Sequence, residues 1–273
     1  MLFEHAAPSI ALPDHVPVLD FFRQTLAVTE SELRKLRHDP LELLTRAIQP
    51  ALWLLVFGHV FSRVRDIPTG GLRYLDFMAP GILAQSVLFI AIFYGISVIW
   101  ERDLGILHKL LVSPASRAAL VLGKALSAGG RGLSQACLVY GLALLMRIQA
   151  RFTVGAILGV AAFIVLGSAI FSTLSLAVAC LVKTRERFMG MGQVLTMPLF
   201  FASNAIYPLA LMPAWLRVIA SVNPLTYQVD ALRDLMIHGG TTTFGLGVDL
   251  AVHVVMLTVL VSVVTKLYPR IIN

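Results

Sequence analysis

The chain has 273 residues, of which 58% are hydrophobic and only 14% are charged, and its mean hydropathy is +0.82. This composition excludes an ordinary soluble domain and indicates a helical membrane protein with several spans. The net charge of +7 does not indicate nucleic acid as a partner, because the basic residues stand between apolar runs, where membrane topology accounts for them.

The N-terminal region precedes the first apolar run. The first 20 residues contain three prolines and three acidic residues without a basic start, so we expect no cleavable signal peptide. Between Val18 and Arg37 the apolar residues recur at helical spacing, which predicts an amphipathic helix too charged to cross a membrane. Its stripe consists of Leu19, Phe22, Leu26, Leu33 and Leu36. Such a helix lies on an anionic membrane surface or packs on a partner subunit, and the two are compatible.

Six apolar runs follow, each a predicted transmembrane helix, and the first is short unless it includes residues 41–44. They are Arg46–Phe61, Leu75–Ile99, Ala118–Met146, Thr153–Val182, Phe188–Ile206 and Leu246–Leu267. Between the second and third runs, residues 101–116 predict either a short amphipathic helix or a simple surface connector, and Ser113-Pro114 would begin the next helix. Lys and Arg are twice as numerous on the side that holds both termini and this segment, so that side is predicted to be cytoplasmic.

Residues 206–237 are too apolar for an ordinary loop but too rich in proline and charge for one span. They predict two short helices, the second beginning with Asn223 as N-cap and Pro224 at the first helical position. One apolar stripe on that second helix consists of Leu225, Val229, Leu232 and Met236. The pattern favours an external re-entrant hairpin, and a loop packed on the membrane face is the alternative.

Arg131 lies deep in the third predicted span. A central arginine costs about 2.5–3.5 kcal/mol on insertion scales, so its side chain should face another helix, water or a substrate. The alternative is that the side chain extends to the membrane interface.

Two strings of the sequence resemble one family. The stretch ERDLGILHKLLVSPASRAALVLGK resembles the ERG…L…SP…R…GK segment of ABC-2 type transporter permeases, and MPAWLRVIASVNPLTYQVDALR is similar to their C-terminal signature LP.WL…..NPLTY.VDALR. Here Asp103-Leu104 precede Gly105, whereas the family often has Arg-Glu-Arg-Gly. Among its subgroups, the chain looks most like bacterial daunorubicin-resistance-type drug exporters, with polysaccharide and glycolipid exporters as relatives.

The resemblance implies an all-α polytopic fold in two parts. Residues 1–45 would form a tail and an amphipathic connecting helix, and residues 46–273 a domain of six transmembrane helices in a bacterial inner membrane. A coupling helix at about 101–116 would dock on a cytoplasmic ATPase subunit, present in two copies, through Arg102, Gly105, Leu107, Leu110, Leu111, Ser113 and Pro114. A second permease copy, most simply an identical one, would complete the pathway. The pathway and its outer gate, at about 206–238, would include Arg131, Tyr207, Pro208, Asn223, Pro224, Tyr227, Asp230 and Arg233.

No sequence motif indicates catalysis in this chain. Gly123-Lys124 is followed by alanine and lacks the first glycine of a phosphate-binding loop, so ATP and Mg²⁺ are expected on the partner subunit. The seven histidines show no paired metal-ligand spacing, and we expect no metal or cofactor site. Two alternatives are a passive pore ringed by Arg131 and, more remotely, an intramembrane enzyme using Asp249 and His253.

Overall fold

The computed structural model describes residues 18–36, 48–62, 68–105, 116–182 and 184–268. These residues are almost entirely helical and contain no strand, apart from an isolated antiparallel bridge between Ala150 and Ile237. Within these ranges, three helices are long and apolar enough to cross a membrane: Tyr74–Asp103, Val154–Leu181 and Leu246–Leu267. The expectation of a helical membrane protein therefore agrees with the fold.

The helices follow the predicted runs closely. The bounds are α1 Val18–Leu36, α3 Ile48–Leu52, π-helix η1 Trp53–Phe57, α4 Gly58–Phe61, α5 Tyr74–Tyr94, α6 Ile96–Asp103, α8 Arg117–Leu145, α9 Val154–Leu181, α10 Arg185–Phe201, 3₁₀ helix η2 Leu209–Leu211, α11 Ala214–Val222, α12 Pro224–Met236 and α13 Leu246–Leu267. The first predicted span is thus a short apolar helix over Ile48–Phe61 with one π-helical turn inside it.

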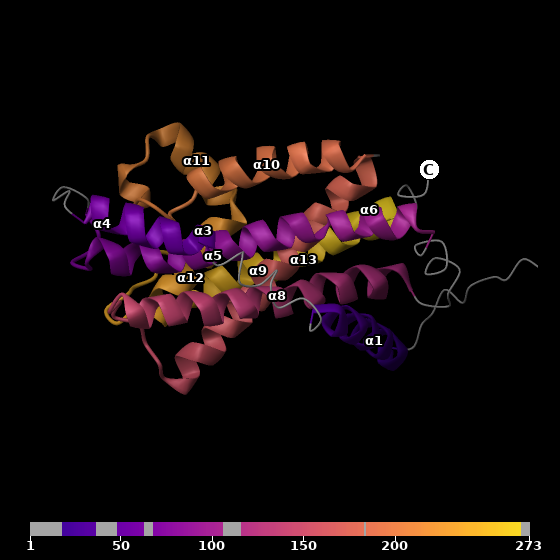
Figure 1. Ribbon diagram of the computed structural model, residues 1–273, viewed down its shortest axis with the longest axis horizontal. Helices are drawn as coiled ribbons and strands as arrows, with labels where there is room; N and C mark the ends of the chain where they lie inside the picture. The colour runs from indigo at the N-terminus through magenta and orange to yellow at the C-terminus, as the bar shows by residue number, and fades with distance from the viewer. Residues whose placement is uncertain (1–17, 37–47, 63–67, 106–115, 183, 269–273) are drawn as a thin grey trace, which may run out of the picture.

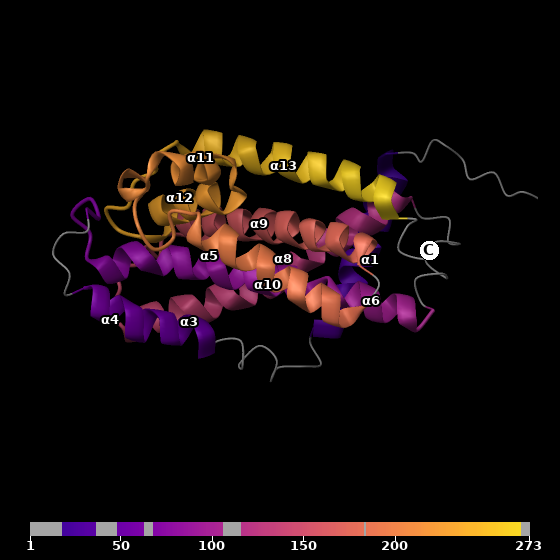
Figure 2. The same ribbon diagram turned by 90° about the horizontal axis from the view of Figure 1, so that it is seen from above.

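The long helices run side by side along the longest axis of the molecule (Figures 1 and 2). One end of this bundle carries α1 and α6, and we call it the α1 end. The opposite end carries α4, α11 and α12, and we call it the hairpin end. The helices α8, α9 and α13 extend from one end to the other.

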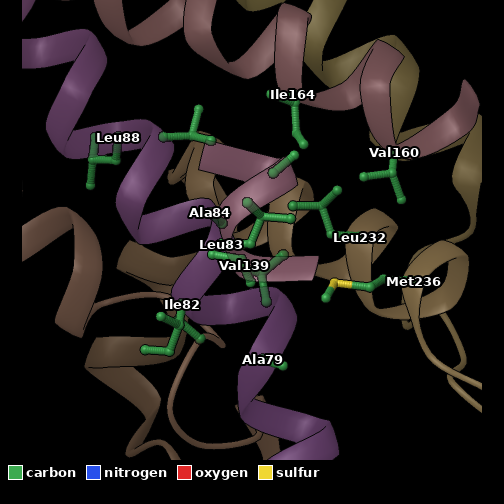
Figure 3. Packing of buried hydrophobic residues seen from close by; sticks show 14 of the residues in the cluster. Ala79, Ile82, Leu83, Ala84, Leu88, Val139, Val160, Ile164, Leu232 and Met236 are labelled. Atoms are coloured by element: carbon green, nitrogen blue, oxygen red, sulfur yellow. The ribbon is translucent and has the colours of Figure 1, made fainter. Parts of the chain in front are cut away.

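Helix α5 forms the centre of the core. Of the most apolar 18-residue segment of Tyr74–Asp103, 78% is buried inside the protein. The corresponding share is 17% for α13, which lies at the periphery. Figure 3 shows Ile82 and Leu83 of α5 packed among Val139 of α8 and Leu232 of α12. Since a lipid-facing helix need not be covered by protein, the exposed apolar face of α13 is consistent with a membrane setting.

The second predicted span differs from the expectation at its end. Gly95 separates α5 from α6, and a side chain there would collide with the Ser175 hydroxyl of α9. The helical path then continues to Asp103. Glu101 and Arg102, the first residues of the predicted 101–116 segment, therefore occupy the last turn of α6, and the chain leaves it through Gly105 at φ +70°.

Candidate functional site

A buried ion cluster lies at the α1 end. Lys124 of α8 is only 1% exposed, and its Nζ lies 2.6 Å from Oε2 of Glu101 on α6 and 3.3 Å from Oε1 of Glu32 on α1. Both carboxylates are buried as well. Charges removed from water are tolerated only when they are paired and hydrogen-bonded, so the three side chains tie together three separate helices.

Tyr94, in the last turn of α5, extends this cluster to a fourth helix. Its hydroxyl donates to Oε2 of Glu32 at 2.7 Å and lies 3.2 Å from the hydroxyl of Ser127. The guanidinium carbon of Arg131 stands 4.3 Å from the centre of the Tyr94 ring, a cation–π contact. We call Glu32, Tyr94, Glu101, Lys124 and Arg131 the Lys124 cluster.

Helix α1 docks on α8 through its small and polar face. Gly123 allows the approach, because a Cβ at that position would lie 2.7 Å from Val28 and 2.9 Å from the carbonyl oxygen of Thr25. The Thr29 hydroxyl reaches the Gly123 carbonyl oxygen at 3.2 Å. The predicted apolar stripe instead points away from the bundle: Leu19, Phe22 and Leu26 are 57–64% exposed. The helix is amphipathic as predicted, and its apolar face stays available to a membrane surface.

The residues predicted to couple to an ATPase fall largely outside the described part of the chain. Leu107, Leu110, Leu111, Ser113 and Pro114 all belong to residues 106–115, which the structure does not describe. The described start of α8 is capped by Ser116, whose hydroxyl accepts the backbone N–H of Ala119. Helix α8 accordingly begins at Arg117, three residues after Pro114.

Arg102 and Gly105 are described, and they adjoin a second ion pair. The Asp103 carboxylate lies 2.8 Å from the Arg185 guanidinium of α10 and 3.1 Å from that of Arg102. Arg185 also stacks over Trp100, with 3.7 Å between the guanidinium carbon and the ring centre. The end of α6 is therefore fixed to the start of α10.

The helical hairpin agrees with its sequence pattern. Asn223 caps α12, its Oδ1 accepting the Leu225 N–H at 3.0 Å, and Pro224 occupies the first turn. All four residues of the predicted stripe, Leu225, Val229, Leu232 and Met236, are fully buried. The predictions of two short helices, of the cap and of the stripe are confirmed.

The other predicted gate residues tie the hairpin to its surroundings. The hydroxyl of Tyr207 donates to the Phe201 carbonyl oxygen, and that of Tyr227 donates to the Ser221 carbonyl oxygen at 2.7 Å. Pro208 precedes η2. These contacts are short-range: the first reaches the last residue of α10, and the second joins α12 to the end of α11.

Two charged residues of α12 are buried. Arg233 donates to the Asn204 carbonyl oxygen at 2.7 Å and stacks over Phe77 of α5 at 3.9 Å. Oδ2 of Asp230 accepts the backbone N–H groups of Thr243 and Phe244 at 2.7 and 3.0 Å. Arg233 thus holds α12 against α5, and Asp230 fixes the loop that leads to α13.

The predicted site residues gather at opposite ends of the bundle. Arg131 belongs to the Lys124 cluster through its contact with Tyr94, whereas the hairpin residues lie at the hairpin end. Sequence reasoning missed Glu32, Tyr94, Glu101 and Lys124 as a group. The available signal was Lys124 itself, a lysine about two turns inside an apolar helix, since such a charge requires a buried partner or an interface to reach.

The enzyme alternative gains no support from its two residues. The His253 ring nitrogen Nδ1 contacts the backbone carbonyl oxygen of Asp249 at 2.7 Å, which is an ordinary i to i−4 helix contact rather than a carboxylate–imidazole pair. The ring packs edge-on against Phe163. Among the described residues there is also no group of three His, Cys, Asp or Glu side chains placed to hold a metal ion.

Apolar helices, a buried charged cluster at one end and a two-helix hairpin at the other define a polytopic helical membrane protein. The chain belongs to the ABC-2 type transporter family, whose profile matches residues 23–237. It is 31% identical over 224 residues to the putative transport permease ycf38 of Cyanophora paradoxa, covering 80% of this chain and 76% of that protein.

Relatives from bacteria carry names that refer to drugs. The daunorubicin resistance ABC transporter permease protein DrrB1 of Streptomyces coeruleorubidus is 27% identical over 236 residues, with 85% of this chain and 81% of that protein covered. The probable multidrug ABC transporter permease YbhR of Escherichia coli K12 is 27% identical over 174 residues, with 63% and 46% covered. The resemblance stated from the sequence strings is therefore confirmed.

Proposed function

We propose that this chain is the membrane-spanning permease subunit of an ATP-driven ABC exporter, which moves a hydrophobic or amphipathic compound outward. Membership of the ABC-2 type transporter family and the names of two relatives, one a daunorubicin resistance permease and one a probable multidrug permease, support this role. Export of a polysaccharide or glycolipid is the second candidate, because exporters of those compounds are related. The ATP and Mg²⁺ would be bound by a separate cytoplasmic subunit.

The Lys124 cluster is the observation that carries the proposal. It joins α1 and α6, the elements that lead into the proposed ATPase interface, to α8 and α5 inside the bundle. A displacement of the 101–116 segment by an ATPase would therefore be transmitted to the long helices by a rigid, dry connection rather than by a loop. Rigid-body movement of packed helices is a common form of such a transition.

The orientation follows from the same assignment. The α1 end and both chain termini would be cytoplasmic, six helical segments would cross a bacterial inner membrane, and the hairpin would form the outer gate. Two ATPase subunits and a second permease copy would complete the transporter, with the identical chain as the simplest second copy. Exposed apolar residues of α3, η1 and α13, among them Leu52, Leu55 and Val255, provide surface for lipid or for that copy.

Replacement of Leu107 by arginine tests the proposed coupling. A charge on the docking face should abolish ATP-driven transport and copurification of the ATPase, while membrane insertion and helix content stay unchanged. The measurements are pull-down of the partner ATPase and transport of a fluorescent drug in proteoliposomes. Leu107→Met, which keeps an apolar side chain of similar volume, should behave like the wild type. Normal transport by the Leu107→Arg protein would contradict the docking role.

Replacement of Arg131 by alanine separates transport from folding. The loss of one cation–π contact should lower the free energy of unfolding by only about 0.5–2 kcal/mol. The transport rate should fall by much more than this small loss of stability would cause. The reason is that the guanidinium is a partly exposed charge in the middle of α8 and would face the pathway. Thermal unfolding of the purified protein and the transport assay, measured on one preparation, decide this. Unchanged transport would place the side chain outside the pathway.

The passive pore makes an opposite prediction. A pore would conduct ions through the purified chain alone, whereas the proposed permease should show no steady conductance without its ATPase and ATP. Planar-bilayer recording of the purified chain distinguishes the two.

A further inference from the structure

A pocket of about 160 Å³ opens at the hairpin end. Four segments form its walls: the loop before α5, α5 itself, the stretch after α10, and α12 with the loop that follows it. The lining residues with polar side chains are Thr69, Asn204, Arg233, Thr241 and Thr243. The volume is well above that needed for one water molecule and suffices for a small group with its hydration.

Arg233 gives this pocket its charge. Among the described residues that line the pocket, it is the only charged one, and its side chain is largely buried. Its Nη2 and Nε donate to the backbone carbonyl oxygens of Asn204 and Phe77, which fix the guanidinium in place. An arginine presents five N–H donors in a planar fork. Among the described residues, the other N–H groups of Arg233 have no hydrogen-bond acceptor.

Asn204 supplies the second observation. It is 1% exposed, and neither its Oδ1 nor its Nδ2 has a hydrogen-bond partner among the described residues. Burying an amide without a partner is costly, so a native chain seldom leaves one in this state. An arginine and an unpartnered amide donor on one pocket, with the threonine hydroxyls of the 241–243 loop beside them, form a set of donors that suits an anion.

The nearest carboxylate on α12 does not line the pocket. Asp230 turns its Oδ2 to the backbone N–H groups of Thr243 and Phe244, on the loop that forms one pocket wall. Asp76 at the start of α5 pairs with Arg73 at 2.8 Å and also accepts the Gln149 N–H. Both oxygens of Asp76 are therefore engaged, whereas Oδ1 of Asp230 is buried without a hydrogen-bond partner among the described residues.

We propose that this pocket binds an oxyanion group, a carboxylate or a phosphate, held by Arg233 and by the Nδ2 donor of Asn204. The bound group would bridge the loop before α5 to α12 and to the 239–243 loop. It would thereby fasten the hairpin to the rest of the bundle. The site is inferred from the pocket and its lining residues alone, so it does not depend on the transport reaction.

Calorimetric titration of the full-length chain in phosphatidylcholine nanodiscs tests the site. Sodium phosphate and sodium acetate are added at constant ionic strength, with sodium chloride as the blank. We expect saturable binding of at least one of the two anions to the wild type. In Asn204→Asp the affinity should fall by roughly tenfold or more, since a hydrogen bond to a charged partner is lost and a like charge is introduced.

Arg217→Gln is the matched control. Arg217 belongs to the same hairpin and donates to the Met212 carbonyl oxygen, but it does not line the pocket. This variant should bind as the wild type does. Arg233→Gln should not bind, and Asn204→Asp keeps the test decisive if Arg233→Gln fails to fold. Absence of saturable binding, or wild-type affinity in Asn204→Asp, would overturn the proposal.

Nanodiscs that contain phosphatidylglycerol identify the source of the anion. If a lipid headgroup occupies the pocket, wild-type affinity for added phosphate should fall in these nanodiscs by competition, and the difference should vanish in Asn204→Asp. If the ligand is a soluble compound, the two lipid compositions should give equal affinities. Either result supports the oxyanion site and assigns its source.

Discussion

Replacement of Lys124 by methionine is expected to lower the free energy of unfolding by about 3–5 kcal/mol, the range measured when one partner of a buried ion pair is removed. Methionine fills a similar volume, so the loss reflects charge rather than a cavity. Glu101 and Glu32, both buried and both in contact with Nζ of Lys124, would lose that cation together.

The same substitution at Lys266 serves as the control. Lys266 lies in the last turn of α13, and its side chain is exposed. Chemical or thermal unfolding in a defined detergent should show a large shift for Lys124→Met and almost none for Lys266→Met. Equal shifts in the two variants would show that the Lys124 cluster does not hold the helices together.

Combining Lys124→Met with Glu101→Gln identifies the pair that matters. If the cost arises from a buried carboxylate left without its cation, neutralising Glu101 should recover part of the lost stability, and the double-mutant cycle gives that interaction energy directly. Hydrogen exchange of α1 adds a local readout. Its amides should exchange faster in Lys124→Met, because Glu32 fastens this helix to α8.

Local signals in the sequence were sufficient for the helical hairpin. Asn223-Pro224 is a cap followed by a residue suited to the first turn, and the spacing of Leu225, Val229 and Leu232 indicates the buried face without reference to any distant residue. The positions of the long helices were equally accessible, because apolar length alone determines them.

The Lys124 cluster could not be predicted in the same way. Lys124 and Glu32 are separated by 92 residues, and Lys124 and Glu101 by 23, so their pairing depends on how three helices pack. The docking face of α1 posed a similar problem. Its apolar stripe predicted the face for a membrane surface or a partner subunit but not the face that meets α8, which contains Thr25, Val28 and Glu32, since α8 offers a glycine and a lysine there.

The break at Gly95 shows a further limit. A glycine inside an apolar run is common in membrane helices, and nothing nearby distinguishes this one. Its role depends on Ser175, a residue of α9 that occupies the place where a side chain would be. Contacts of this kind are decided by the tertiary packing and not by the local pattern.

Replacement of Asn223 by alanine is expected to destabilise the hairpin strongly. The side chain is 3% exposed and makes three hydrogen bonds: Oδ1 caps α12, and Nδ2 donates to the carbonyl oxygens of Leu199 and Ala202 at 2.7 and 3.1 Å. The lost cap alone costs about 0.5–2 kcal/mol. The two carbonyl groups at the end of α10 add a further roughly 1–3 kcal/mol each if no water replaces the amide.

Aspartate at the same position separates these two contributions. Asn223→Asp retains a capping oxygen at the start of α12, where a negative charge also suits the helix dipole, but it removes both donors and places a carboxylate beside two carbonyl oxygens. If the link to α10 dominates, Asn223→Asp should be at least as unstable as Asn223→Ala. If the cap dominates, aspartate should restore most of the wild-type stability.

Accessibility of a cysteine placed at Ser221 reports the loosening directly, because Ser221 is exposed and only two residues before the cap. Wild-type stability and wild-type labelling in both variants would show that Asn223 does not couple α12 to the end of α10.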